Sequence, residues 1–354
     1  MSHVAAAFLV LFGFPLLAQA DDIGVFTDQK DIGVLLHAGF SHFDLQSRIY
    51  TLYASGENMW AAKDAFHFRF TKATGDFSLS ADISFLEAGT DKHRKACLML
   101  RQDLDPDSAY IDVALHGDGL TSLQFREAKG ALTHEIQSNI QKPRRLRLEK
   151  RGQFVYLFLS SSNTEEPTFC GASHLMVFQE PFYVGLAVCS HNKDITESAT
   201  FSNVVLNTKL KSSPRPTLYS TLETQSIAST DRRVVLTTTE MIESPAWTLD
   251  GTSLLFTKAD QRYLISATAP AATPQATSIS AVGLISSNTS PDGKRQLSVS
   301  TSGDASITSL QLLTLSSNKT DLLANLSAVP GLSISPCWSP DSKKIAFISY
   351  HRVP

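Results

Sequence analysis

Charge is scarce in this chain. Asp, Glu, Lys and Arg make up 18% of its 354 residues, and the formal net charge at pH 7 is -3. That balance produces no field strong enough to attract nucleic acid or an anionic membrane, so we expect neither as a partner. The densest basic run, residues 142–151, alternates Leu146 and Leu148 with Arg145 and Arg147. This alternation indicates a half-buried strand with a solvated face.

Cysteine is also scarce, and no pair of cysteines has the CxxC spacing of a zinc cluster. The four are Cys97, Cys170, Cys189 and Cys337. Cys97 and Cys189 fall on the less apolar faces of the strands expected there. Two states remain open, namely free buried thiols or a bridge between Cys97 and Cys189 if their strands are neighbours.

Sequence motifs of several enzyme classes are missing. The chain has no G-x-S-x-G nucleophile elbow, no P-loop and no G-x-G-x-x-G dinucleotide motif. Serine, histidine and aspartate are too common here to single out a triad. We therefore expect no catalytic residues and a protein that is not an enzyme.

Only one long apolar run occurs, over residues 4–17, and Ala18-Gln19-Ala20 follows it as a small-x-small cleavage pattern. The run has the length of a signal-peptide core and is too short for a comfortable membrane span. We expect a signal peptide over residues 1–20. The mature protein should be periplasmic or secreted, and not membrane-spanning.

What the chain does have is β-strand periodicity, clearest over residues 96–127. One face collects apolar side chains and the other polar ones, with turns at 105–108 and 116–119. The apolar set is Leu98, Leu100, Ile111, Val113, Leu115, Leu123 and Phe125, and the polar set is Arg101, Asp112, His116, Gln124 and Arg126. We expect one face in a core and the other in solvent.

The same alternation continues on both sides of this stretch. Residues 66–70 alternate Phe with His67 and Arg69, and residues 77–85 alternate apolar side chains with Ser and Asp. No segment shows a helical period. Strands at roughly 10- to 15-residue spacing predict an all-β sandwich over residues 21–208. A Pro- and Ser-rich linker should follow at 209–217.

Residues 218–354 carry a repeat. Ser-Pro-Ala-Trp at 244–247 is followed by Asp250-Gly251, Ser-Pro recurs before Asp292-Gly293, and Ser-Pro-Cys-Trp at 335–338 precedes Asp341. The aspartates are 42 and 49 positions apart, which fits one four-stranded propeller blade per repeat. We expect structural roles at these positions, with tryptophan packing between blades and aspartate forming the turn. The positions are Trp247, Asp250, Gly251, Asp292, Gly293, Trp338 and Asp341.

Two families resemble these segments. SGENMWAAKDAFHFRF, KACLMLRQDLDPDSAYIDVALHGDG and PFYVGLAVCSHN resemble the concanavalin A-like jelly-roll module of exported bacterial proteins, over about residues 22–207. The repeat resembles that of the TolB-like family, periplasmic β-propellers. The whole chain is similar to exported TolB-like proteins with an amino-terminal jelly roll.

The resemblance implies a shortened propeller. Six blades would need roughly 250 residues, whereas residues 215–354 supply 140, enough for about three blades. The middle repeat has Thr289 in place of tryptophan. Such a propeller could have lost middle blades, could pack its open edge on the sandwich, or could assemble with another chain.

The jelly-roll resemblance points to a binding face, because the concave sheet of lectin and glucanase sandwiches binds sugars. Candidate ligand-binding residues on the polar face are Arg101, Asp112, His116, Gln124 and His67, with Trp60 or Tyr110 as an aromatic platform. His191 and Asn192 directly follow a strand, as binding residues or as a loop cap. An ordinary solvated sheet face remains the alternative.

Metal and hydrolase signatures are incomplete. Asp103, Asp105 and Asp107 imitate the start of a calcium loop, but Ser108 and Ala114 replace its glycine and its bidentate glutamate. We expect a solvated hairpin turn there and no cofactor, with calcium elsewhere in the jelly roll left open and unassigned. The E-x-D-x-E strand of the hydrolytic relatives is absent, and no strand presents a carboxylate pair.

The functional hypothesis is a non-catalytic exported binding protein. Its jelly roll would recognise a carbohydrate or cell-envelope polymer, and its propeller repeats would bind a protein partner. The alternatives are a divergent glycan hydrolase or lyase acting on the same concave face, and a protein-interaction scaffold without a small-molecule site.

Overall fold

The computed structural model describes residues 24–89, 91–162, 164–211, 215–278 and 287–353. Every regular element in these ranges is a β-strand, so the predicted all-β class is confirmed. This part of the chain contains no helix long and apolar enough to cross a membrane. The expected signal peptide, residues 1–20, lies outside the described residues.

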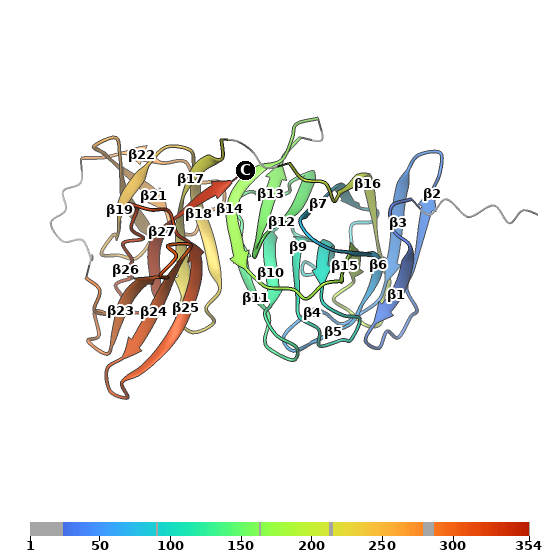
Figure 1. Ribbon diagram of the computed structural model, residues 1–354, viewed down its shortest axis with the longest axis horizontal. Helices are drawn as coiled ribbons and strands as arrows, with labels where there is room; N and C mark the ends of the chain where they lie inside the picture. The colour runs from blue at the N-terminus through green and yellow to red at the C-terminus, as the bar shows by residue number, and fades with distance from the viewer. Residues whose placement is uncertain (1–23, 90, 163, 212–214, 279–286, 354) are drawn as a thin grey trace, which may run out of the picture.

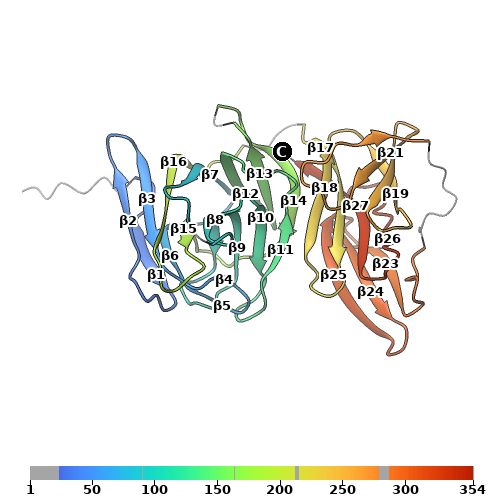
Figure 2. The same ribbon diagram turned by 180° about the vertical axis from the view of Figure 1, so that it is seen from behind.

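Two antiparallel sheets stacked face to face form the N-terminal sandwich (Figures 1 and 2). One layer is the first part of an 11-stranded sheet, in the order β1 (Asp28–Ile32), β6 (Phe66–Ala73), β15 (Phe182–Cys189), β8 (Lys95–Arg101), β9 (Tyr110–His116), β10 (Thr121–Arg126) and β11 (His134–Gln137). The other layer is a 7-stranded sheet, in the order β14 (Thr168–Leu175), β13 (Phe154–Ser160), β12 (Arg145–Arg151), β7 (Phe77–Phe85), β16 (Glu197–Asn207), β3 (Ile49–Ala54) and β2 (Phe40–Asp44).

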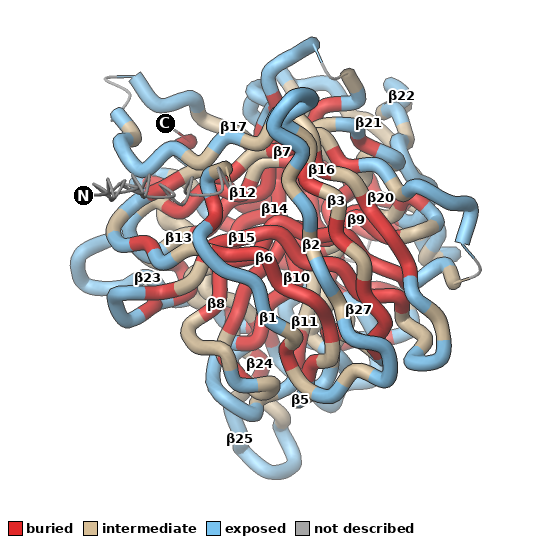
Figure 3. The backbone as a smooth tube through the Cα atoms, turned by 90° about the vertical axis from the view of Figure 1, so that its right-hand side faces the viewer, coloured by how far each residue is buried: buried red, intermediate tan, exposed pale blue. Residues whose placement is uncertain are grey.

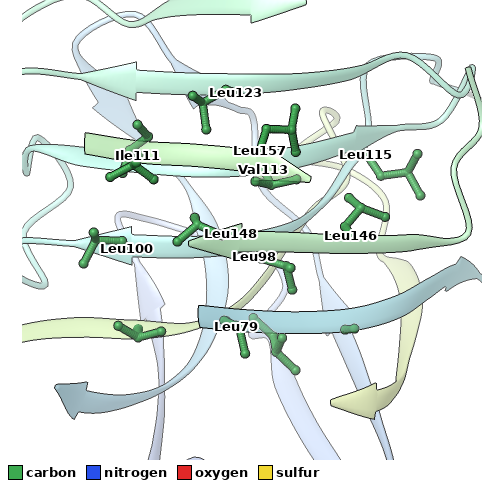
Figure 4. Close-up of a cluster of buried hydrophobic side chains, with 14 of the residues drawn as sticks. Leu79, Leu98, Leu100, Ile111, Val113, Leu115, Leu123, Leu146, Leu148 and Leu157 are labelled. Atoms are coloured by element: carbon green, nitrogen blue, oxygen red, sulfur yellow. The ribbon is translucent and has the colours of Figure 1, made fainter. Parts of the chain in front are cut away.

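The core between these layers contains the apolar face predicted for residues 96–127. Leu98 and Leu100 of β8 and Ile111 and Val113 of β9 are fully buried there. They pack against leucines of the opposite sheet, among them Leu79, Leu146, Leu148 and Leu157, as Figure 4 shows. The basic run at 142–151 forms β12 as expected, with its leucines in the core and Arg145 paired to Asp82 at 2.6 Å.

The opposite face of the same strands is not in solvent. All residues of β8, β9 and β10 are buried, and Figure 3 shows them inside the molecule. The expectation of one core face and one solvent-exposed face is therefore wrong for these strands. The physical reason is a second cover, formed by residues 55–65 with the short hairpin β4 (Met59–Trp60) and β5 (Lys63–Asp64).

The C-terminal region continues the sandwich sheet instead of forming a separate body. Strand β11 pairs in parallel with β18, and the sheet extends through β17 and β27 to β26. Figure 1 shows the yellow β17 and β18 beside the red C-terminal β27. The bounds are β17 (Thr217–Ser226), β18 (Arg232–Thr238), β26 (Cys337–Trp338) and β27 (Lys344–Val353).

Two further sheets complete this region. The first is 4-stranded, with β19 (Ile242–Trp247), β20 (Ser253–Lys258), β21 (Gln261–Ser266) and β22 (Gln275–Ala276), and the second is 3-stranded, with β23 (Arg295–Thr301), β24 (Ile307–Thr314) and β25 (Lys319–Ser327). Trp247 and Trp338 are both buried in the apolar clusters of this region. Its strands β18, β17, β27 and β26 are joined to the sandwich sheet through the pairing of β11 with β18.

A buried polar network holds the two regions together. Arg232 of β18 donates from Nη2 to the carbonyl of Ser173 on β14 at 2.7 Å, and its Nη1 lies 3.4 Å from the carboxylate of Glu223. Thr237 Oγ1 donates to the carbonyl of Cys170 at 3.0 Å. Burial lowers the pKa of His351, which contacts Ser173, to about 3. The predicted linker at 209–217 therefore connects regions that share one sheet.

The repeated aspartates of the C-terminal region form the same turn each time. Asp250, Asp292 and Asp341 each accept a hydrogen bond from the hydroxyl two residues earlier at 2.6 Å. Each also accepts one from the backbone amide two residues later, at 3.0 to 3.1 Å. These bonds lower the pKa of each carboxyl. Asp304 forms the same turn, at a position that the tryptophan motif does not mark.

Replacing one of these aspartates tests their structural role. We expect Asp341→Ala to lower the free energy of unfolding by about 1 kcal/mol, because two hydrogen bonds to the turn are lost. Chemical denaturation followed by fluorescence measures the change. Asp341→Asn keeps an acceptor oxygen and should lose less than alanine does. Equal losses in both variants would show that the acceptor is not what stabilises the turn.

Candidate binding site on the concave face

The covering segment, residues 55–65, is fixed to the sheet by a buried ion cluster. Asp64 accepts hydrogen bonds from Arg101 Nη1 at 2.7 Å and from Arg126 Nη1 and Nη2 at 2.8 and 2.7 Å. All three side chains are fully buried. Tyr110, also buried, donates its hydroxyl to the carbonyl of Met59 at 3.2 Å. Arg101 and Tyr110 thus anchor the cover, and the expectation that they face a ligand on an open sheet is wrong.

His67 lies on the core-facing side of the sheet, opposite to the face that carries Arg101 and Tyr110. It is directly opposite Val188, a residue of the sandwich core, so its side chain points away from the concave face. Its Nδ1 contacts Asp31 at 2.7 Å and its Nε2 contacts Gln29 at 3.2 Å. Burial is the main cause that lowers the pKa of its imidazole. The prediction that His67 joins the concave-face residues is therefore wrong.

The concave face is the face of the sheet that carries Lys95, His116 and Gln124. Its uncovered part contains a cavity of about 350 Å³. Four of the residues singled out from the sequence meet there, namely Trp60, His116, Gln124 and His191. The remaining lining residues are Asn58, His93, Lys95, Leu120, Glu135 and Gln137. The strands β8, β9, β10 and β11 form the floor, and the covering segment supplies Asn58 and Trp60 at one side.

Two polar side chains in the floor have hydrogen-bonding atoms to spare. Gln124 Nε2 donates to His116 Nε2 at 3.2 Å, which places the imidazole proton on Nδ1. Burial lowers the pKa of His116 to about 3, with nearby Lys95 acting in the same direction, so the ring is neutral at physiological pH. His116 Nδ1 and Gln124 Oε1 have no partner among the described residues. The pair thus holds one unused donor and one unused acceptor, both with almost no surface exposed.

Asp112 lies on the same face of the sheet as Gln124, directly opposite it in the neighbouring strand, but does not line the cavity. Its side chain is fully buried, and neither carboxyl oxygen has a hydrogen-bonding nitrogen or oxygen among the described residues. Burial raises its pKa to about 8, while Lys95 acts in the opposite direction. The carboxyl group is accordingly protonated at neutral pH. It lies beside the cavity and is not part of its lining.

Lys95 is the cation of the cavity. Its Nζ donates to Asn58 Oδ1 at 2.8 Å and to the carbonyl of Met59 at 3.1 Å, and it lies 5.4 Å from the centroid of the Trp60 ring. The side chain is almost fully buried. Lys95 thus ties the covering segment to the sheet and faces the cavity together with Trp60.

A group of histidines forms the rim of the cavity. The ring centroid of His93 lies 6.3 Å from that of His116 and 5.2 Å from that of His191. His191 bonds through Nδ1 to Asp91 at 3.1 Å and through Nε2 to Asn58 at 3.1 Å. Asn192 instead stabilises its own loop, since its Oδ1 accepts from the amide of Asp194 at 2.9 Å. Of the two alternatives weighed for this pair, the structure places His191 at the cavity and Asn192 in a loop cap.

Six lining residues had not been singled out from the sequence, namely Lys95, Asn58, His93, Leu120, Glu135 and Gln137. Lys95 could have been found, because the alternation that includes Arg101 extends back through Met99 and Cys97 to Lys95. Glu135 and Gln137 belong to a strand of four residues, too short for a period to be recognised. Asn58 and His93 are in loops, where no periodicity applies.

One lysine, Lys129, pairs with the acidic turn at Asp103, Asp105 and Asp107. Lys129 Nζ contacts all three carboxylates, at 3.8 Å from Asp103, 3.7 Å from Asp107 and in direct contact with Asp105. The bond to Asp105 raises the pKa of Lys129. Across the described ranges, no group of three or more His, Cys, Asp or Glu side chains is arranged to hold a metal ion.

All four cysteines are free and buried. Cys97 and Cys189 do lie on neighbouring strands, β8 and β15, but form no bridge. Burial raises the pKa of Cys170 and of Cys189 to about 11, so these thiols are protonated. Of the two states left open by the sequence, the structure has the free thiols.

Comparison with known proteins finds only distant similarity. No family model matches the chain, and no curated protein matches it. A functionally unknown protein from Saccharomyces cerevisiae has a TM-score of 0.39 at 15% identity, over 49% of this chain and 97% of its own. A putative TolB from Agrobacterium tumefaciens has a TM-score of 0.27 at 15% identity, over 38% and 99%. An alginate lyase of polysaccharide lyase family 7 has a TM-score of 0.32 at 9% identity, over 49% and 84%.

The strand order of the chain itself defines its class. It is an all-β protein in which one layer of a two-layer sandwich continues into a C-terminal region that carries two further sheets.

Proposed function

We propose that the concave-face cavity binds a glycan segment and that the chain is a non-catalytic exported binding protein. The observation that carries this proposal is the cavity that Trp60, His116 and Gln124 line together, with the buried His116 Nδ1 and Gln124 Oε1 left unpartnered. The propeller sheets would bind a protein partner, as the repeats of this class suggest.

The chemistry of the pair suits a sugar. Each sugar hydroxyl both donates and accepts a hydrogen bond, so one hydroxyl can satisfy a neutral imidazole N–H and an amide oxygen at once. The C–H face of a pyranose ring is apolar and packs on an aromatic ring such as that of Trp60. Because His116 and Gln124 are held by each other and by the sheet, little ordering is needed when the ligand binds.

Cleavage of a glycan on the same face is less well supported. Hydrolysis requires two carboxyl groups on either side of the scissile bond, about 5 to 10 Å apart. Glu135 lines the cavity, but Asp112 does not, and its oxygens are shielded from solvent. A reducing-end assay on every glycan that binds tests this alternative, and new chain ends formed by the parent but not by Glu135→Gln would establish it.

The direct test of binding is Trp60→Ala. We expect the variant to bind its glycan about 10- to 100-fold more weakly, since the aromatic contact contributes roughly 1.5–3 kcal/mol. Isothermal titration calorimetry of the full chain against a panel of plant, algal and bacterial cell-wall oligosaccharides measures the affinity. Thermal unfolding of each variant establishes that the fold is intact.

Phe40→Ala serves as a matched control. Phe40 is an exposed aromatic residue that stacks on Tyr53 in the edge strand pair β2 and β3, outside the cavity. Its replacement should leave glycan affinity unchanged. Equal affinity in the parent and in folded Trp60→Ala would place the binding site elsewhere on the molecule.

A further inference from the structure

We infer that the glycan is acidic and that Lys95 binds an anionic group of the sugar, a carboxylate or a sulfate. This inference rests on the proposed function, because it names the class of ligand for the same cavity. It is carried by the hydrogen bonds of the Lys95 ammonium and by the charges around it.

The Lys95 ammonium has bonding capacity left over. It carries three N–H donors, and two of them are directed to neutral oxygens, Asn58 Oδ1 and the Met59 carbonyl. Among the described residues it forms no ion pair with a carboxylate. A buried cation without a counter-charge is costly, and proteins rarely keep one without a use. The third donor is available to the cavity that Lys95 lines.

Among the described residues, neither carboxylate at the cavity forms an ion pair with Lys95. Glu135 accepts a hydrogen bond from Gln137 at 2.6 Å, and Asp91 pairs with His191 at 3.1 Å. Asp112 is on the same face as Lys95, but it lies opposite Met99, whereas Lys95 lies opposite His116 at the far end of the strand. A ligand anion would therefore supply the ion-pair partner that Lys95 lacks among the described residues.

The surroundings of Lys95 also favour a sugar anion over a free inorganic ion. The Trp60 ring lies beside the ammonium, and His116 and Gln124, each with an unpartnered polar atom, line the same cavity. A ring that carries a carboxylate or a sulfate next to a hydroxyl engages all of these groups together. A small anion would use the ammonium alone.

The test compares matched oligosaccharides on the full chain. The first is a tetrasaccharide of uronic acids, and the second is the same tetrasaccharide with its carboxyl groups reduced to alcohols. The third is a tetrasaccharide of neutral sugars that carries sulfate groups. We expect the parent to bind an acidic form at least tenfold more tightly than the reduced form, with an affinity that falls as salt rises. Lys95→Met should lose this preference, and Lys95→Arg should keep most of it.

The control is Lys319→Met, which removes an exposed lysine paired with Asp321 in the C-terminal region and should leave the preference intact.

Preference for the uronate assigns the anion as a carboxylate, and preference for the sulfated form assigns it as a sulfate. If the reduced form binds the parent as tightly as both acidic forms, this inference fails while glycan binding stands. If no tetrasaccharide binds but neutral glycans of the wider panel do, the inference again fails alone. If no glycan of either set binds, the proposed function fails as well.

Discussion

Asp64→Ala should lower the free energy of unfolding by about 3–5 kcal/mol. The aspartate is the shared partner of Arg101 and Arg126, and all three side chains are fully buried. Without its carboxylate, two guanidinium groups remain in the interior with no counter-charge. Their remaining hydrogen bonds, such as that from Arg126 Nη1 to the Ser108 carbonyl at 3.1 Å, do not replace that charge. Urea denaturation of parent and variant measures the difference.

The same substitution should also release the covering segment. Residues 55–65 are held to the sheet through Asp64, so limited proteolysis should cut the variant there at concentrations that leave the parent whole. Asp321→Ala is the matched control, because its ion pair with Lys319 is largely exposed and contributes less than about 1 kcal/mol. A variant at Asp64 that is as stable as this control would contradict the described role of the buried cluster.

Asp112→Asn should change how stability depends on pH. Burial raises the pKa of Asp112 to about 8 in the folded protein, whereas an aspartate in the unfolded chain has a pKa near 3.9. Between about pH 4 and pH 8 the folded state therefore keeps a proton that the unfolded state has released. Stability is favoured at the acid end of this window and is lost as the pH rises, by up to about 1.4 kcal/mol per pH unit.

Asparagine cannot ionise, so the variant lacks this dependence. We expect its free energy of unfolding, relative to that of the parent, to rise by as much as about 4 kcal/mol between pH 5 and pH 8. Denaturation curves at pH 5, 6, 7 and 8 measure it. His116 and His351, each with a pKa lowered to about 3, act in the opposite direction below pH 6.5, but they are present in both proteins and cancel. Parallel pH profiles would show that Asp112 is ionised in the folded state.

Local periodicity could predict the strands and their faces, but not what covers them. The alternation in 98–125 places Leu98, Ile111 and Val113 on one face and Asp112 on the other, and the structure agrees. It could not predict the burial of Arg101, because the cover comes from a loop about forty residues earlier in the chain. For His67, both faces of β6 are buried, so periodicity could not decide which of the two faces the core.

Long-range pairing left even less trace in the sequence. The parallel ladder between β11 and β18 joins residues almost one hundred positions apart through two register pairs, Ile136 with Arg232 and Gln137 with Arg233. The cavity is of the same kind, because its residues come from strands and loops between Asn58 and His191. Trp60, His116, Gln124 and His191 could be named from residue type and face, whereas Lys95 required the alternation to be followed to the start of its strand.

Tryptophan fluorescence during a glycan titration tests the central claim most directly. Trp247 and Trp338 are buried in the C-terminal region, whereas Trp60 is only half-buried at the cavity. A glycan that fills the cavity should produce a saturable change in emission, and the change should disappear in Trp60→Phe while calorimetry still detects binding. A saturable change that persists in Trp60→Phe, or binding that leaves the emission of the parent unchanged, would contradict the assignment of the concave-face cavity as the glycan site.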